Sequence, residues 1–332
     1  MVAPAAKIEG AEALIARRPR PAKGAAWAEA AREAARGRLL AMGAPGRRDE
    51  YWRFTDPAPL LAEGARAAVV DEAPGFDGVE ALRLVFVDGA FRPDLSDAPE
   101  MEGVEIQPLA VALGADIHWA RGLFGALEAA GQSPVSRPFA ALNTATAEAG
   151  FAIRVTGRPA KPILFEYRHE REEAEASIRG LVKVEPGAEA TLLETGPAAA
   201  RFDKVFEIEL CEGAFLRHAR MQGPDHDRLA ATHVFARIAA GARLRAFTLT
   251  TNGRLTRNEY VMELNGENAS GHVAGAAIGA AGFHHDDTVF VTHAAAHCES
   301  RQVFKKVLRA GARGVFQGKI LVNQSEQKTD GY

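Results

Sequence analysis

The stretch Phe206-Glu207-Ile208-Glu209-Leu210 decides the fold of this sequence. Apolar and charged residues alternate strictly along it, and this period of two is typical of a β-strand with one buried face. We therefore expect Phe206, Ile208 and Leu210 to point into a core. Glu207 is expected on the opposite face, in solvent, where truncation to alanine changes stability by about half a kcal/mol at most.

The strand recurs along the chain with glycine between the copies. Turn glycines at Gly187, Gly213, Gly241 and Gly266 are separated by 26, 28 and 25 residues. A repeat of this length indicates a solenoid or a propeller, and a propeller blade needs about 40 residues. The repeat therefore predicts a parallel β-helix over residues 151–332, in which each coil buries one apolar row against its neighbours.

The first 150 residues have a different character. Residues 1–80 are rich in Ala, Leu, Arg and Glu, which favour helices, and Gly43 followed by a proline is a helix stop signal. We expect an N-terminal helical region there and a mixed α/β segment at 81–150. The individual elements predicted are helices at 11–18, 25–42, 118–130 and 137–149 and a strand at 84–87. The sequence as a whole thus predicts a mainly β protein with helices at its N-terminus.

Composition excludes several classes of protein. Of the 332 residues 47% are hydrophobic and 25% are charged, with a net charge of −3, as in ordinary globular proteins. Nucleic-acid binding is not expected, because the nearest basic cluster is small and lies beside prolines. No apolar run reaches the roughly 20 residues that cross a bilayer, and a signal-peptide core is lacking, so no membrane association is expected. The basic cluster comprises Arg17, Arg18, Arg20 and Lys23.

The two cysteines, Cys211 and Cys298, rule out a disulfide framework and favour a reducing cytoplasm. Cys298 is open to three interpretations: an apolar core residue, a nucleophile, or a thiolate that handles sulfur or binds a cluster. The neighbouring His297 and Arg301 favour a thiolate, whereas sequence alone favours the core residue. Cys211 continues an apolar row and is given no role.

Potential metal ligands are densest between residues 284 and 298. On a strand, His284 and Asp286 share one face while His285 and Asp287 share the other. A metal-dependent hydrolase needs a third ligand and an open coordination position. A His-x-Asp-x-His array would need a histidine at position 288, where Thr288 stands. The metal candidates are His284, Asp286 and His293.

From residue 293 onward the sequence resembles a known family. The run His293-Ala294-Ala295-Ala296-His297-Cys298-Glu299-Ser300-Arg301, with segments 312–320 and 327–330, is similar to the signature of the SufB/SufD family of iron–sulfur cluster assembly proteins, and most similar to its SufD branch. Further segments resemble other parts of the family, so the resemblance covers nearly the whole chain. Those segments are 50–55, 139–143 and 257–258. Departures at Thr288 and Lys306 weaken a metal role for the region 284–293.

The resemblance implies a right-handed parallel β-helix and a non-catalytic scaffold subunit. Such a subunit supports cluster assembly and iron acquisition together with SufB, as a heterodimer, and the ATPase SufC. The iron–sulfur cluster is then present transiently in the complex and is not bound stably by this chain alone. His297 and Cys298 are the candidate cluster-handling residues.

An enzyme on a β-helix, either a metal-dependent hydrolase or a polysaccharide lyase, is the alternative function. A lyase usually needs paired carboxylates and exposed aromatic rings along a groove. Aromatic residues make up only 7% of this sequence, and no tryptophan follows Trp119. The residues therefore favour the scaffold.

Members of the family continue past the motif at 327–330 into further β-helix and a terminal helical domain, whereas this sequence ends at Tyr332. The resemblance places SufC docking on that helical domain, so we do not expect this chain to recruit SufC. The last coil, around Val315, Ile320 and Val322, is expected to expose an apolar face and to favour self-association.

Overall fold

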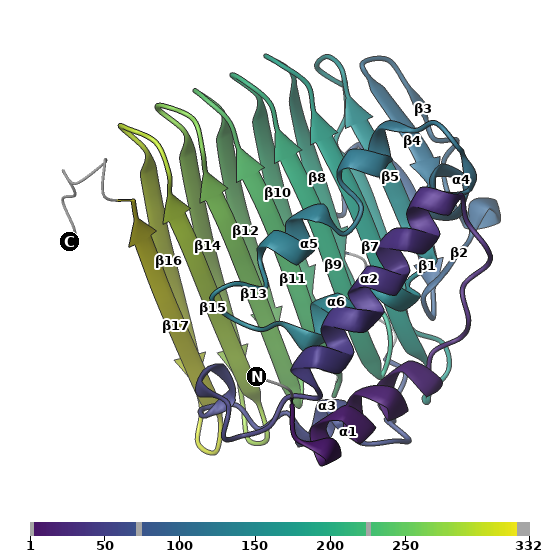
Figure 1. The fold of residues 1–332 in the computed structure, drawn as a ribbon, viewed down its shortest axis with the longest axis vertical. Coiled ribbons are helices and arrows are strands. Elements are labelled where there is room, and N and C mark those ends of the chain that lie inside the picture. Colours follow the sequence, from purple (N-terminus) through teal and green to yellow (C-terminus); the bar gives the residue numbers. More distant parts are fainter. Residues whose placement is uncertain (1–2, 71–74, 224–226, 324–332) are drawn as a thin grey trace.

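The computed structural model describes residues 3–70, 75–223 and 227–323. Within them the chain forms a parallel β-solenoid with helices packed along one side (Figure 1). The mainly β fold and the parallel β-helix predicted from the glycine repeat are confirmed.

Two sheets face each other across the core, and successive strands of the solenoid alternate between them. Sheet A consists, in spatial order, of β2 (Ala90–Phe91), β1 (Leu82–Val87), β6 (Ile163–Arg168), β8 (Glu189–Thr195), β10 (Phe215–Gln222), β12 (Arg243–Thr251), β14 (Ser270–Gly279) and β16 (Glu299–Leu308). Sheet B consists of β3 (Glu100–Met101), β4 (Val104–Pro108), β5 (Ala149–Val155), β7 (Glu175–Val184), β9 (Arg201–Leu210), β11 (Leu229–Ile238), β13 (Leu255–Leu264), β15 (His284–His293) and β17 (Arg313–Val322).

The strand register reproduces the predicted repeat. Arg201 of β9 pairs with Leu229 of β11, and Leu229 pairs with Leu255 of β13, so successive coils are offset by 28 and then 26 residues. These pairings are parallel, and the antiparallel pairs lie at the N-terminal end, where β2, β3 and β4 join the sheets. Each coil therefore stacks on its neighbours in one direction.

From β7 onward, each turn from sheet B into sheet A contains one residue with a positive φ. Its amide donates to a carbonyl of the next coil, as from Gly213 to Ala240 at 2.9 Å. In the fourth turn this residue is Asn268 and not the predicted Gly266. Gly266 is needed for space, because a Cβ atom there would lie 2.1 Å from the nitrogen of Ala240. The positive-φ residues are Gly187, Gly213, Gly241, Asn268 and His297.

Helices cover the outer face of sheet B (Figure 1). Leu39 of the second helix and Leu142 of the sixth share an apolar cluster with Leu229 and Leu255 of the sheet. Among the described residues no helix is long and apolar enough to span a membrane. The helices are α1 (Ala5–Ala16), α2 (Ala26–Met42), α3 (Ala58–Leu61), α4 (Leu109–Gly114), α5 (Ala126–Ala130) and α6 (Pro138–Thr146), with 3-10 turns at Glu50–Trp52, Pro93–Leu95 and Trp119–Gly122.

Two predicted helices are shorter than expected. The helix predicted at 118–130 is interrupted by Gly125, whose φ of 75° is incompatible with a continuous α-helix, so only α5 remains. The helix predicted at 137–149 ends at Thr146, because the chain enters β5 at Ala149.

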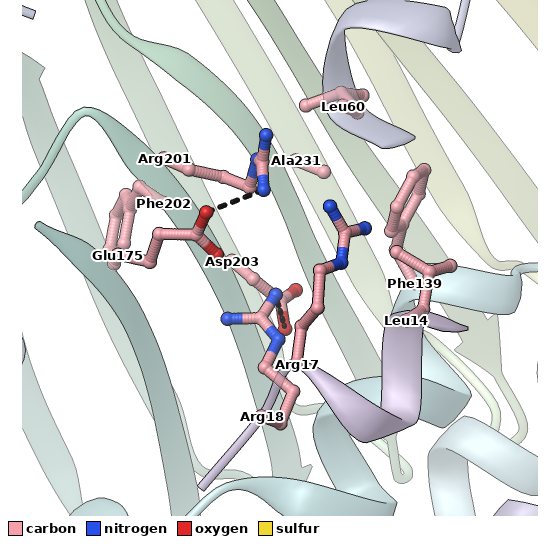
Figure 2. Close-up of a pocket in the computed structure, with 10 residues that line it drawn as sticks. All are labelled: Leu14, Arg17, Arg18, Leu60, Phe139, Glu175, Arg201, Phe202, Asp203 and Ala231. Carbon is pink, nitrogen blue, oxygen red and sulfur yellow. Dashed lines mark hydrogen bonds and ion pairs between the residues drawn. The ribbon is translucent and has the colours of Figure 1, made fainter. Parts of the chain in front are cut away.

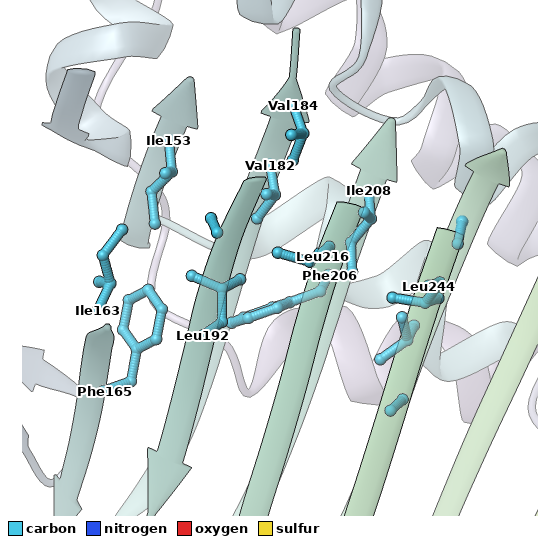
Figure 3. Packing of buried hydrophobic residues seen from close by; sticks show 14 of the residues in the cluster. Ile153, Ile163, Phe165, Val182, Val184, Leu192, Phe206, Ile208, Leu216 and Leu244 are labelled. Carbon is cyan, nitrogen blue, oxygen red and sulfur yellow. The ribbon is translucent and has the colours of Figure 1, made fainter. Parts of the chain in front are cut away.

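The predicted inward row of β9 is confirmed, whereas the exposure predicted for Glu207 is wrong. Phe206, Ile208 and Leu210 are buried among the apolar side chains that fill the space between the sheets. Figure 3 shows the first two in this cluster. Glu207 points away from this core, as the alternation predicted, but it is 0% exposed. The reason is that α5 and α6 cover this part of sheet B.

The last described strands, β16 and β17, expose apolar side chains. Ile320 is 53% exposed, which confirms the exposed apolar face expected there, while Val315 and Val322 are half-buried. Self-association through this face stays a prediction. Other exposed apolar residues of the two strands are Val307, Leu308, Phe316 and Leu321.

Candidate functional site

The interior of the solenoid is polar along one edge. Near the turns that lead from sheet B into sheet A, the inward side chains are apolar, as at Leu210 and Leu216. Near the opposite edge, where sheet A connects to sheet B, the inward side chains are charged, amide and hydroxyl groups. We call this second set the interior polar chain. Its members are Tyr167, Glu194, Lys204, His218, Arg220, Gln222, Thr232, Thr250, Asn258, His285, Asp287 and Lys306.

Glu194 of β8 is the centre of the first part of this chain. Its carboxylate accepts from Lys204 Nζ and from the Tyr167 hydroxyl, at 2.5 and 2.8 Å, and lies 2.5 Å from His218 Nε2 and 3.3 Å from Arg220 Nε. Burial alone would raise the pKa of Glu194, but the charges of Lys204 and Arg220 hold it well below its usual value. The carboxylate is therefore ionised.

The pKa of Lys204 is lowered to about 7, because burial and the nearby guanidinium of Arg220 outweigh the attraction of Glu194. Burial also lowers the pKa of His218. The buried cluster thus contains two nitrogen bases, Lys204 and His218, whose protonated forms are disfavoured.

Amide and hydroxyl groups continue the chain toward the next coils. Arg220 Nη2 donates to Thr232 Oγ1 at 3.2 Å, and Thr232 donates in turn to Asn258 Oδ1 at 2.7 Å. Asn258 Nδ2 donates to Gln222 Oε1 at 3.1 Å, as does the Thr250 hydroxyl at 2.8 Å. The side-chain amides and hydroxyls therefore satisfy one another inside the solenoid.

The far end of the chain is ionic again. Asn258 Nδ2 lies 3.3 Å from His285 Nε2, and His285 Nδ1 lies 3.2 Å from Lys306 Nζ, which also pairs with Asp287 at 3.0 Å. Burial, followed by the charge of Lys306, holds the pKa of His285 well below its usual value. Burial raises the pKa of Asp287, against the opposing charge of Lys306.

The interior polar chain is a continuous path of groups with exchangeable protons, from β6 to β16. Stability does not explain it, since apolar residues of similar volume in such positions are often as stable or more stable. Clustered groups with shifted pKa values are typical of functional sites. We therefore treat it as the candidate functional site.

A second set of buried charges lies on the other side of sheet B, under the helices. Arg257 of β13 pairs with Glu259 at 2.7 Å and with Asp286 at 2.6 Å, and Arg137 pairs with Glu259 at 2.9 Å. Burial alone would raise the pKa of Glu259, but Arg257 and Arg137 lower it to about 2. This set attaches the helical layer to the sheet.

The structure separates the three metal candidates. His284 and Asp286 share a face of β15, as predicted, and both contact the Thr55 hydroxyl, with His284 Nε2 at 3.0 Å. His293 lies nine residues along the same strand, about 30 Å away, and contacts Ser300 Oγ at 2.8 Å. No group of three His, Cys, Asp or Glu residues in the described ranges could hold a metal ion. A metal role for these residues stays a prediction.

A family model matches the part of the chain that contains the interior polar chain. It is described as "SUF system FeS cluster assembly, SufBD core domain", and the match covers residues 167–332. The chain belongs to the SufB/SufD family. The predicted membership is confirmed, and the match begins at Tyr167, the first residue of the interior polar chain.

Two curated relatives agree with this membership. The chain is 29% identical over 310 residues to the iron–sulfur cluster assembly protein SufD of Escherichia coli. The aligned region covers 88% of this chain and 69% of that protein. It is 26% identical over 333 residues to an iron–sulfur cluster assembly SufBD family protein of Synechocystis. This aligned region covers 90% of this chain and 70% of that protein. This similarity to SufD agrees with the resemblance predicted from the motif at residues 293–301.

The two candidate cluster-handling residues of this SufB/SufD family chain lie in the turn between β15 and β16. His297 is exposed and has a φ of 57°, which histidine tolerates better than most residues. Cys298 is partly buried against the main core, with Sγ 3.3 Å from the carbonyl oxygen of Gly266. Cluster handling by either residue stays a prediction.

Sequence reasoning missed most of the interior polar chain. Lys204 lies in the same phase as Phe202 and Phe206, so a lysine in an apolar row was the available signal. In the register, Lys204 pairs with Thr232, Thr232 with Asn258, and Asn258 with Asp287. A polar column is recognised only when the four strands are aligned, and a single strand does not reveal it.

A small pocket lies where α1 meets sheet B (Figure 2). Arg201 pairs with Glu175 at 2.6 Å, and Arg18 approaches Asp203 at 3.8 Å. Burial raises the pKa of Asp203 to about 6, against the opposing charge of Arg18. Arg17 donates to a backbone carbonyl at 2.9 Å. Arg18 thus approaches sheet B, whereas Arg17 contacts the residue that follows α3. The absence of nucleic-acid binding stays a prediction.

Proposed function

We propose that this chain is a non-catalytic scaffold subunit of the Suf iron–sulfur cluster assembly system. The match of the SufBD core domain to the residues that form the interior polar chain carries the proposal. The relative from Escherichia coli is named as an iron–sulfur cluster assembly protein, which supports the same role. The proposed location is the cytoplasm.

The proposed partner of this chain is SufB, in a heterodimer, and the ATPase SufC is proposed as a further member of the complex. A stacked solenoid suits a scaffold, because its coils form a rigid rod on which a partner can be held in fixed register. In this proposal the iron–sulfur cluster is cargo of the complex. It is present transiently, and the chain alone does not bind it stably. His297 and Cys298 are proposed to handle it at the exposed turn.

Co-expression with SufB and SufC tests the partnership. The tagged chain is purified, and native mass spectrometry measures which proteins it retains. Retention of SufB in a defined stoichiometry is the expected result. Recovery of the chain without SufB, from cells in which SufB is abundant, would count against the proposal.

Anaerobic reconstitution tests the role of the interior polar chain in the same complex. Lys204→Met removes one of the two buried cations around Glu194, and the carboxylate of Glu194 stays paired with Arg220, so no unpaired buried charge is left. We expect the yield of iron–sulfur cluster, measured by visible absorbance, to fall while the complex still assembles. Cys298→Ser and His297→Ala test the exposed turn in the same assay. An unchanged yield in every variant would remove these residues from the proposed mechanism.

A further inference from the structure

The outer face of sheet A is open over β12, β14 and β16. The helices lie on the opposite side of the solenoid, against sheet B (Figure 1). On the open face Phe247 is 44%, Ile278 46% and Val307 61% exposed. Side chains of these three strands therefore form an accessible surface within the described part of the chain.

Basic residues align across this face. Arg217 of β10 pairs in register with Arg245 of β12, Arg245 with His272 of β14, and His272 with Arg301 of β16. Neighbouring strands lie about 4.8 Å apart, so the four side chains form a row about 14 Å long. Arg243 lies beside this row on β12. We call these five residues the basic ladder.

Few carboxylates lie close enough to neutralise the positive charges of the ladder. Like charges directly opposite each other on a sheet are destabilising. Within the described ranges, Arg217 has one carboxylate within ion-pair distance, Glu189 at 3.8 Å. Among the described residues no carboxylate pairs with Arg243, Arg245 or Arg301. Glu299 of β16 also lies on this face, in the row of Arg243 and Ser270. The net charge of the whole chain is −3, so this positive face is a local feature.

One aromatic ring contacts three of the five ladder residues. The guanidinium carbons of Arg217, Arg243 and Arg245 lie 3.9, 4.4 and 5.7 Å from the centroid of the Phe215 ring. Cation–π contacts at such distances contribute favourably and fix the planar groups in place. The guanidinium donors are thus held close together, and binding an anion would cost little side-chain entropy.

An apolar row runs beside the ladder. Ala219, Phe247, Ala274 and Val303 follow one another in register, two residues further along the same strands. Ile278 and Val307 form another such pair beyond it. A phosphate backbone has no groups that match exposed apolar side chains, whereas a polypeptide can present carboxylates and apolar side chains together.

From this juxtaposition we propose that the outer face of sheet A binds an acidic, partly apolar segment of a partner protein. Its Glu and Asp carboxylates pair with the arginines of the ladder, in part bidentately. Its apolar side chains cover Phe247, Ile278 and Val307. The segment is expected to associate rapidly at low salt and more weakly as ionic strength rises.

Fluorescence anisotropy with a labelled Glu-rich peptide containing interspersed Leu residues tests the proposal on the complete chain. We expect saturable binding that weakens at least about tenfold in the variant R243E/R245E/R301E. The matched control R36E/R48E/R121E makes the same change in net charge at exposed arginines outside this face, and it should bind within about twofold of the parent chain. Circular dichroism melting checks that both variants are folded.

A second variant and a second probe complete the test. Phe247→Ser removes an apolar contact without changing charge, and it should weaken peptide binding by about threefold or more. A labelled oligothymidine is the comparison probe. Tighter binding of oligothymidine than of the peptide, or equal loss of binding in R243E/R245E/R301E and its control, would overturn the proposal.

Discussion

Replacement of Glu207 by alanine should strongly destabilise the protein. Its carboxylate accepts from the amides of Gly125 and Glu128 at 2.7 and 2.9 Å and pairs with Arg179, which is itself fully buried. Loss of one partner of a buried ion pair costs about 3 to 5 kcal/mol. Each stranded amide adds a desolvation cost of about 1 to 3 kcal/mol that partly overlaps with it. We therefore expect a loss near 5 kcal/mol in the free energy of unfolding.

Urea unfolding followed by circular dichroism measures this loss, and Glu209→Ala is the matched control. Glu209 lies two residues along β9, with its side chain 30% exposed and its cationic partners at 3.7 and 4.0 Å. Its removal should change stability by about half a kcal/mol. If Glu207→Ala and Glu209→Ala unfold within about 1 kcal/mol of each other, the buried pair does not attach the helices as described.

The double variant Arg179→Met/Glu207→Leu separates lost charge pairing from lost packing. Both charges are removed, so no unpaired ion remains, and apolar replacements of buried pairs are often neutral. We expect it to recover at least about 2 kcal/mol of the loss caused by Glu207→Ala. A double variant as unstable as the single one would show that the two amides, and not Arg179, dominate the effect.

Four further predictions follow from buried, reactive and exposed groups. Ile208→Ala should lower the free energy of unfolding by about 2 to 5 kcal/mol in the same urea assay, since the side chain is fully buried. The folded-state pKa of Asp203 is about 6, above its usual 3.8, so folding favours the protonated carboxyl. The free energy of unfolding should therefore fall by about 3 kcal/mol as the pH rises from 4 through 6. In the variant Asp203→Asn the free energy of unfolding should change less over this pH range. A thiol-reactive probe should label Cys298 faster than Cys211, whose thiol pKa is raised by burial; the reverse order would contradict a reactive Cys298. Ile320→Glu should reduce self-association on a sizing column at high protein concentration, and a strictly monomeric parent chain would refute association through this face.

Local features of the sequence were sufficient to predict the solenoid. The alternation at 206–210 and the spacing of Gly187, Gly213 and Gly241 reflect strand and turn geometry, which each coil satisfies within a few residues. Glu207 was misjudged because alternation identifies two faces of a strand and does not reveal what covers the second one. That cover is supplied by α5 and α6, far away in the sequence.

The candidate site was predictable only in part, for a related reason. The common face of His284 and Asp286 followed from the strand period, because both lie in one strand. The cluster of Glu194, Lys204 and His218 comes from three strands in two sheets, and no local pattern joins them. Family motifs near Cys298 drew attention to an exposed turn, whereas the strongest pKa shifts lie inside the solenoid.

The stacked turns into sheet A also restrict how this protein can change in evolution. Amides at Gly187, Gly213 and Gly241 donate to the coil that follows, so an added residue there would break a contact in two coils at once. From β7 onward these turns have four or five residues, whereas the connections at the opposite edge range from three residues between β12 and β13 to six between β10 and β11. Insertions, deletions and grafted loops should therefore accumulate along that edge, and an insertion within a strand would turn Lys204 or its counterparts out of the interior.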